Sequence, residues 1–181
     1  MRSPLPITAL AALALAMGLG WQSARSQSSS VTALAGVYEN VAPDGGRSAI
    51  VAGTDEALAD ARRIVRALAR PRILENNPPV NRLTIAINGS EARVTYDGQR
   101  SYYGPIGNGA PVTQTSPEGG EVNVRYILEG DALVEIAEAK EGTGRIRYEL
   151  DGGELLVHTQ IDSRYLPAPI RFSMRFRPEQ P

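Results

Sequence analysis

The chain has 181 residues, with 19 basic and 20 acidic side chains, one histidine and no cysteine. This balance argues against a general nucleic-acid binder, whose affinity depends on a basic surface. A chain without cysteine has neither disulfides nor thiolate chemistry, and a single histidine makes a zinc site unexpected. We therefore expect a fold held together by its apolar core, with no metal and no cofactor.

The first 26 residues have the pattern of a secretory signal peptide. Arg2 precedes a short apolar run, ITALAALALAMGLGW, and Ala24 and Ser26 are small enough for signal-peptidase cleavage. The run is short for a membrane span, which needs about 20 residues, although an uncleaved anchor is the alternative. We expect cleavage near Ser26 and export to the periplasm or the medium. The remaining residues 27–181 then form one domain without an integral membrane span.

One strand and one helix come next. The stretch LAGVYENV alternates weakly before a PDGG turn, which predicts a first strand. Over residues 54–70 apolar side chains recur at spacings of three and four, which predicts a helix with Thr54 as its N-cap and Pro71 as its stop. The apolar face of this helix consists of Ala57, Leu58, Ala61, Ile64, Val65 and Leu68.

From residue 81 onward the alternation has period two, which predicts β-strands. Tight-turn signals such as Asn88-Gly89 and Asp97-Gly98 separate the strands, and a Gly- and Pro-rich stretch over residues 104–120 leaves room for one short strand near 112–115. We predict an all-β fold of about 8–10 strands with antiparallel neighbours. Such a meander hides its edges by closing into an up-and-down barrel, and a two-sheet sandwich is the alternative.

The stretch PIRFSMRFRP shows which face of a strand is buried. Its apolar residues Ile170, Phe172, Met174 and Phe176 alternate with arginines, so period two places the first set in the core and the arginines in water. We interpret the arginines as a solvated barrel wall, with no nucleic-acid binding. A basic stripe for nucleic acid or membrane is the alternative.

The residues that could carry catalysis are sparse. His158 and Asp162 share a strand but lie about 13 Å apart, too far for a hydrogen bond, and we expect His158 on the outer face. Glu135, Glu138 and Glu141 are expected to be solvated charges. We therefore predict that the protein is not an enzyme and assign no catalytic residue, with a hydrolase or isomerase as the third hypothesis.

Four tyrosines lie on the apolar faces of their predicted strands: Tyr38, Tyr96, Tyr126 and Tyr148. A buried tyrosine hydroxyl needs a hydrogen-bond partner, which another side chain or a bound ligand could supply. Ordinary core packing is the alternative interpretation.

The motif LAGVY, followed by a β-meander and an arginine-bearing last strand, resembles the lipocalin and fatty-acid-binding barrels. There a Gly-x-aromatic motif packs against a late arginine, which implies structural roles for Gly36, Tyr38 and Arg175. The position of the helix is similar to that of the helical lid in fatty-acid-binding proteins. The order of LENNPPVNRLTIAI, YDGQ, LEGDALVE and YELDGGELLVHTQIDSRYLPAPIRFSMRF resembles lipocalin-like proteins that bacteria secrete, and this likeness implies no catalytic residue.

We expect a non-enzymatic protein that binds a small apolar or amphipathic ligand inside the barrel. The candidate lining residues are Ile85, Tyr96, Val124, Tyr126, Tyr148 and Phe172. The alternative is a solid-core periplasmic module for protein interaction or envelope maintenance. Its candidate surfaces are the loop at residues 104–120 and Arg62, Arg63 and Arg66 on the helix. The sequence does not indicate an oligomeric state.

Overall fold

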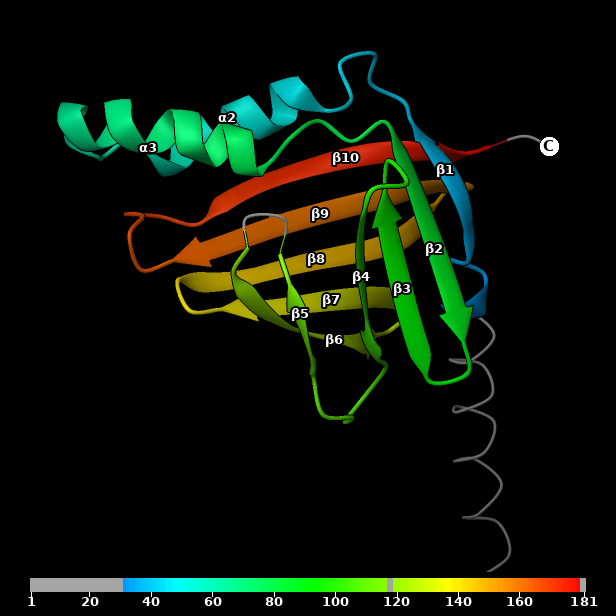
Figure 1. Ribbon diagram of the computed structural model, residues 1–181. Coiled ribbons are helices and arrows are strands. Elements are labelled where there is room, and N and C mark those ends of the chain that lie inside the picture. Colours follow the sequence, from blue (N-terminus) through cyan, green and yellow to red (C-terminus); the bar gives the residue numbers. More distant parts are fainter. Residues whose placement is uncertain (1–30, 117–118, 180–181) are drawn as a thin grey trace, which may run out of the picture.

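A computed structural model describes residues 31–116 and 119–179 (Figure 1). In this part of the chain two helices, α2 and α3, lie between the first and second of ten strands. The strands are β1 (Gly36–Asn40), β2 (Arg82–Asn88), β3 (Glu91–Tyr96), β4 (Arg100–Pro105), β5 (Val112–Thr115), β6 (Glu121–Glu129), β7 (Ala132–Ala139), β8 (Gly142–Asp151), β9 (Glu154–Ser163) and β10 (Ile170–Pro178).

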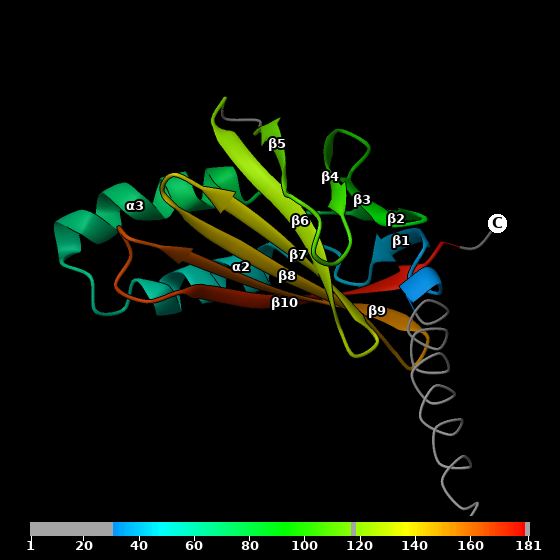
Figure 2. The ribbon, with the colours of Figure 1, turned by 90° about the horizontal axis from the view of Figure 1, so that it is seen from below.

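All ten strands belong to one antiparallel sheet with the order β4-β3-β2-β1-β10-β9-β8-β7-β6-β5. Neighbours in the sheet are consecutive in sequence except for β1 and β10, which pair with Tyr38 opposite Pro178. Strands β1–β4 cross β6–β10 steeply, so the sheet wraps around on itself (Figures 1 and 2). The predicted antiparallel meander is confirmed, and it forms a nearly closed barrel.

The barrel closes between β4 and β6 through a few contacts. Ile106 bridges to Tyr126, and the N–H of Gly107 donates to the carbonyl of Tyr126 at 2.8 Å. The side-chain amide of Gln114, on β5, donates to the carbonyl of Tyr103 at 2.6 Å and accepts from its N–H at 3.2 Å. This amide imitates the paired hydrogen bonds of an antiparallel neighbour. At the seam, the side chain of Gln114 thus makes the two hydrogen bonds to β4 that the backbone of a paired strand would make.

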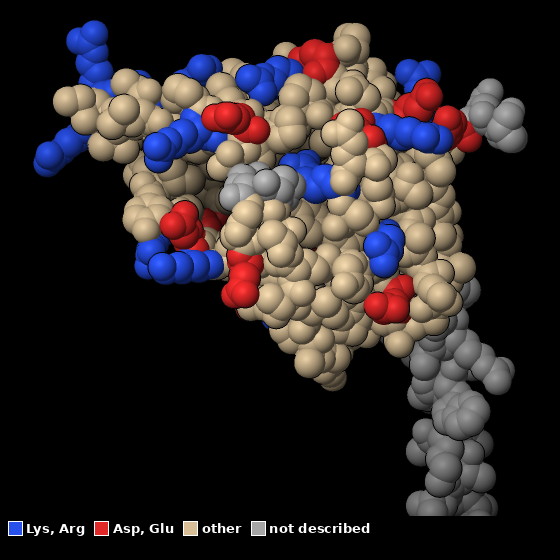
Figure 3. All heavy atoms as spheres, in the orientation of Figure 1, with Lys and Arg blue, Asp and Glu red and all other residues tan. Residues whose placement is uncertain are grey.

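The predicted strand faces are confirmed along β10. Ile170, Met174 and Phe176 are buried in the barrel and Phe172 is half-buried, whereas the arginines between them are exposed. Arginines and acids are interspersed over the face shown in Figure 3, with no basic stripe on that face. That face is formed by β2–β5; on the outer face of β8–β10, Arg147 pairs with Glu149 and Arg175 with Asp151, which agrees with the solvated-wall interpretation.

The helical region differs from the prediction of one helix over residues 54–70. Helix α2 spans Arg47–Ala57 and helix α3 spans Arg63–Asn76. Thr54 lies inside α2, where its hydroxyl donates to the Ile50 carbonyl at 2.7 Å, so it is not an N-cap. Pro71 lies inside α3 and does not stop it. The predicted apolar face is divided, because the chain turns between its two halves.

Helix α2 is the helix that packs on the barrel. It lies along β10 and buries Ile50, Gly53, Thr54 and Ala57 (Figure 1). Gly53 makes this approach possible, because a Cβ there would overlap the carbonyl oxygen of Arg171. Close helix–strand contact of this kind needs glycine.

Polar contacts join helix α3 to α2 and to the turn that follows α2. Arg70 forms a bidentate ion pair with Asp55, and Arg66 donates to the carbonyls of Leu58 and Ala59. Within α3 itself, Leu74 is the buried residue. The predicted core residues of this helix, Ile64 and Leu68, are 76% and 71% exposed.

Candidate functional site

The barrel interior is filled by its own side chains at one end. Successive inner positions of β7–β10 form rows across the sheet, and the row Leu128, Leu133, Tyr148, Val157 and Met174 lies toward this end. Beyond it, Leu155 pairs with Phe176, and both are fully buried. This half of the barrel is a solid core.

The other half of the interior is more open. The next row contains Tyr126, Glu135, Ile146, Thr159 and Phe172, of which Ile146 and Phe172 are only partly buried. The row after that has small or partly exposed residues at its centre: Ala137, Gly144 and Ile161. We use the name open cup for six residues of these two rows: Ala137, Gly144, Ile146, Thr159, Ile161 and Phe172.

The strand ends beyond the open cup form a pocket of about 460 Å³. Its lining comes from the β7–β8 turn and the β9–β10 loop and includes Lys140, Glu141, Asp162 and Arg164. In Figure 3 the surface is hollowed below α3 at this end of the barrel. The pocket lies at the same end of β8 and β9 as the open cup, and the partial exposure of Ile146, Ile161 and Phe172 shows that solvent reaches this half of the interior.

A buried polar cluster separates the open cup from the solid core. Glu135 is fully buried on the inner face of β7, and its Oε2 accepts hydrogen bonds from Tyr148 at 3.0 Å and Tyr126 at 3.1 Å. The hydroxyls of Tyr96 and Tyr148 lie 2.5 Å apart. The Tyr126 hydroxyl also lies 3.1 Å from the Tyr102 carbonyl. Each of the strands β3, β6 and β8 thus contributes one tyrosine whose hydroxyl lies near the Glu135 carboxyl group.

A proton on Glu135 would satisfy all of these contacts. The four oxygen–oxygen contacts of 3.1 Å or less each need one hydrogen, and the three hydroxyls supply three. A carboxylic acid at Oε2 supplies the fourth by donating to Tyr126, which then donates to Tyr102. The geometry fits a neutral glutamic acid; in the ionised form Tyr126 donates to Oε2 instead, and its contact with the Tyr102 carbonyl is left without a hydrogen.

The electrostatic surroundings agree with the neutral form. Burial raises the pKa of Glu135 to about 7 from its ordinary 4.5, although hydrogen bonds from Tyr148 and Tyr126 and the charge of Arg100 act in the opposite direction. Burial also raises the pKa of each of the three tyrosines, so their hydroxyls keep their protons. The cluster holds one exchangeable proton near neutral pH.

Two polar atoms of this region lack a partner. Among the buried side-chain atoms that the structure describes, Oε1 of Glu135 and Nε of Arg100 have no hydrogen bond. Arg100 is on β4 opposite Tyr96, and its guanidinium lies 4.9 Å from the centre of that ring. An unpaired buried acceptor and an unpaired buried donor each cost about 1–3 kcal/mol. Unpaired groups of this kind mark a place where another polar group can bind.

The titration of Glu135 predicts a pH-dependent stability. In the unfolded chain this carboxyl loses its proton near pH 4.5 and in the folded protein near pH 7, so between these values the folded state binds more protons. The free energy of unfolding is therefore highest, as far as Glu135 is concerned, below about pH 4.5. It decreases by roughly 3 kcal/mol as the pH rises through 7. Glu135→Gln removes this titration, and urea unfolding of both proteins across this range measures the difference.

A control separates this effect from the titration of the other acids. Glu138→Gln changes the same residue type on the same strand, but at an exposed position. We expect its stability to follow that of the wild type at each pH. Parallel curves for the wild type and Glu135→Gln would show that Glu135 is already ionised in the folded protein.

The structure places all six predicted lining residues on the inner face. Tyr96, Tyr126 and Tyr148 belong to the polar cluster. Ile85 and Val124 are fully packed in the core, and Phe172 lies at the open cup. Whether any of them touches a ligand stays a prediction.

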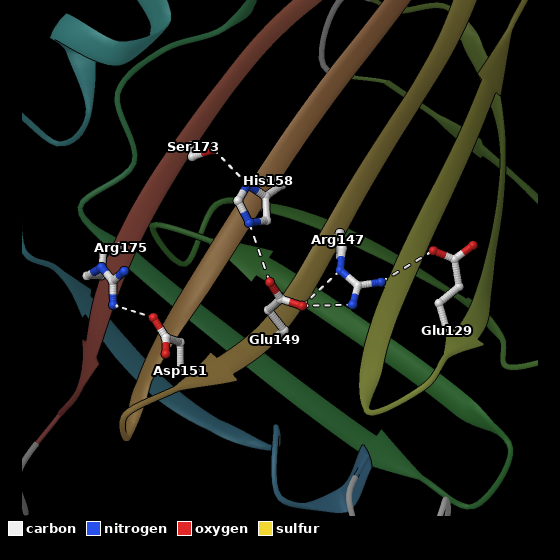
Figure 4. Close-up of polar contacts among 7 residues, drawn as sticks. All are labelled: Glu129, Arg147, Glu149, Asp151, His158, Ser173 and Arg175. Carbon is white, nitrogen blue, oxygen red and sulfur yellow. Dashed lines mark hydrogen bonds and ion pairs between the residues drawn. The ribbon is translucent and has the colours of Figure 1, made fainter.

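The three residues with predicted structural roles are not all brought together. Tyr38 is buried, its hydroxyl donates to the Leu34 carbonyl at 2.9 Å, and its ring lies beside Gly36. Arg175, however, is on the outer face, where it forms an ion pair with Asp151 at 3.1 Å (Figure 4) and a second one with Glu154. Because Arg175 and Tyr38 are on opposite faces, the predicted packing of this arginine on the first strand is wrong.

The outer wall holds a polar network that includes the single histidine (Figure 4). Nδ1 of His158 lies 2.7 Å from Ser173 Oγ, and its Nε2 lies 3.4 Å from Glu149, which is paired with Arg147. His158 is on the outer face, as predicted, and its partners come from β8 and β10 rather than from Asp162. The network joins three adjacent strands across a solvated wall, which is a structural role.

Sequence reasoning missed two residues of the polar cluster. Glu135 was expected to be solvated but is fully buried, and Arg100 was not considered. The pairing of Tyr96 with Arg100 across the Asp97-Gly98 turn is a signal that places Arg100 on the same face as Tyr96.

Among residues 31–116 and 119–179, no group of three or more histidine, cysteine or acidic side chains could hold a metal ion. No helix in that part of the chain has the length and apolar character that a membrane span needs. The predicted signal peptide at residues 1–26 lies outside the described residues.

No protein-family model and no curated protein sequence matches the chain, but solved structures do. The REP1-NXSQ fatty acid transporter has a TM-score of 0.53 at 11% identity, over 82% of this chain and 98% of its own. The Schistosoma mansoni fatty acid binding protein in complex with arachidonic acid has 0.51 at 11% identity, over 83% and 99%. A secretary abundant heat soluble protein from Ramazzottius varieornatus has 0.51 at 10%, over 80% and 94%. The chain thus has the barrel fold of fatty-acid-binding proteins.

Proposed function

We propose that the protein is an exported, non-enzymatic carrier that binds a small amphipathic molecule in the open cup. The observation that carries this proposal is the division of the interior, with a solid core at one end and small, partly exposed apolar residues at the other. Apolar cavities with a few convergent polar groups are the usual form of a small-molecule site. The names of two structural neighbours, a fatty acid transporter and a fatty acid binding protein, support the same ligand class.

The ligand would lie with its apolar part against Ile146 and Phe172 and its polar end toward Glu135 and Arg100. This orientation satisfies the two unpaired polar atoms and leaves the apolar part in the half of the barrel that opens to the surface. Secretion and a periplasmic or extracellular location are part of the proposal, supported by the apolar run and small residues of positions 1–26.

Native mass spectrometry of the exported protein, followed by organic extraction, tests the proposal directly. A stoichiometric small molecule with an apolar part, on a chain that begins near Gln27, would support it. A protein of bare mass that also fails to bind a panel of amphipaths and the hydrophobic dye Nile red would contradict it.

A phenylalanine at position 144 should block the cup. Gly144 is on the inner face of β8, and a Cβ there would be in ordinary contact with Ala137 at 3.8 Å, so the backbone accepts a side chain. We expect Gly144→Phe to fill the cup and abolish Nile red binding, with a loss of stability under about 2 kcal/mol. Fluorescence titration measures binding and thermal unfolding measures stability.

Arg177→Phe is the control, because it places the same side chain at an exposed position on the outer face of β10, away from the pocket. Binding by this variant should equal that of the wild type. Equal binding by Gly144→Phe would show that the dye site is not the open cup.

A second candidate function, protein interaction, is favoured by helix α3. Ile64 and Leu68 are strongly exposed one helical turn apart, and Arg62, Arg63 and Arg72 are exposed near them. This surface is complementary to a partner with an acidic and partly apolar face. A pull-down that fails for the Ile64→Ser, Leu68→Ser double variant but succeeds for Leu150→Ser, with no ligand in the cup, would favour this function.

A further inference from the structure

Two unpaired atoms of opposite hydrogen-bonding character lie in one part of the interior. Oε1 of Glu135 can accept a hydrogen bond, and Nε of Arg100 can only donate one. Both residues contact Tyr96, because its hydroxyl lies 3.5 Å from Glu135 Oε2 and the Arg100 guanidinium stacks over its ring. A ligand head group that reaches this place meets one acceptor and one donor.

We propose that this pair selects a neutral head group that both donates and accepts a hydrogen bond, an alcohol or a primary amide, over an ionised carboxylate. The inference rests on the proposed function, since it names the ligand class of the same cup. An alcohol donates to Oε1 of Glu135 and accepts from Nε of Arg100, so both unpaired atoms are satisfied. A carboxylate can only accept, so it leaves Oε1 without a partner.

Charge gives this selectivity a dependence on pH. The groups that face Glu135 are Tyr126 from β6, Tyr148 from β8, Tyr96 from β3 and Arg100 from β4. The tyrosines stay neutral, so the charge near a head group is set by Glu135 and Arg100 alone. When Glu135 is protonated, Arg100 attracts a carboxylate. When Glu135 is ionised, it repels that carboxylate and accepts more strongly from an alcohol or amide.

Three ligands with the same apolar tail test the inference: dodecanol, dodecanamide and dodecanoate. Their affinities are measured by displacement of Nile red at about pH 6 and about pH 8.5, where the carboxylic acid of the tail is ionised in water. At the higher pH we expect both neutral ligands to bind at least about tenfold more tightly than dodecanoate, the loss expected for one unpaired buried group. At the lower pH the difference should become smaller.

Two pairs of variants assign the selectivity to these atoms. Glu135→Gln keeps the shape and cannot ionise, so dodecanoate should gain about tenfold at the higher pH and lose its pH dependence. Glu138→Gln, at an exposed position of β7, should leave all affinities unchanged. Arg100→Met should weaken the neutral ligands by about tenfold, whereas Arg93→Met, an exposed arginine that stacks on Tyr103, should not.

The outcomes separate this inference from the proposed function. Dodecanoate that binds as tightly as dodecanol at the higher pH, or an unchanged preference in Glu135→Gln, overturns the inference while the carrier function stands. Binding of Nile red without binding of any of the three ligands does the same. If Nile red also fails to bind, the carrier function itself is wrong, and the inference is wrong with it.

Discussion

Gly53→Val should release helix α2 from the barrel. The new Cβ would overlap the Arg171 carbonyl oxygen, and because this obstacle is backbone in β10, the helix has to move away. Movement of that size exposes Ile50 and Leu58, which are both fully buried. Burial of an aliphatic side chain stabilises by about 1.5–3 kcal/mol, so we expect a loss of roughly 3–6 kcal/mol. Chemical denaturation measures this loss.

Hydrogen exchange can show which part of the Gly53→Val protein is loosened. Hydrogen exchange should become faster over Arg47–Ala57, while the barrel strands away from β10 keep their protection. Ala52→Val is the control, because it introduces the same β-branched residue into the same helix at an exposed position. If the two variants have equal stability and equal exchange, α2 does not depend on close contact with β10.

The two phenylalanines of β10 should respond very differently to truncation. Phe176 is fully buried in the solid core, and Phe176→Ala leaves a cavity there, which costs about 3–5 kcal/mol. Phe172 faces the same interior but borders the open cup, where solvent already reaches it, so Phe172→Ala should cost much less. Urea unfolding of the two variants compares the two halves of the barrel on one strand.

Ligand binding should show the opposite order. Phe172→Ala removes a wall of the cup and should weaken Nile red binding, whereas Phe176→Ala should bind normally wherever it is folded. Similar stability losses in the two variants would mean that the interior is packed equally throughout, and the division into cup and core would be wrong.

The strands could be predicted from the sequence because period two is a local signal. Along β10 the alternation of Phe172, Met174 and Phe176 with arginines identified the buried face without tertiary information. The helices were less predictable. The apolar spacing continues from Ala57 to Leu68, but the chain turns near Leu58, and the contacts that hold α3 leave Ile64 and Leu68 in solvent. Periodicity does not tell which apolar face finds a partner.

The candidate site was predictable in part for the same reason. The three tyrosines could be placed inside because each follows the alternation of its strand. Glu135 could not, because Val134 and Ile136 on the other face of β7 are also buried, so both faces look apolar except for the acid itself. Its burial depends on tyrosines from three other strands, which only the closed barrel brings together.

The strand order also constrains how the protein can be made. In the sheet β1 lies between β2 and β10. The first of the ten strands to be synthesised therefore pairs on one side with the last one. During synthesis β1–β4 can pair with one another, and β5–β9 can pair with one another, but until β10 joins both, only the few seam contacts around Tyr103, Gln114 and Tyr126 link the two groups. Non-local pairing of this kind is slow to form. The unfinished chain therefore exposes the edge of β1 throughout translation, and a chaperone or a second nascent chain can pair with that edge.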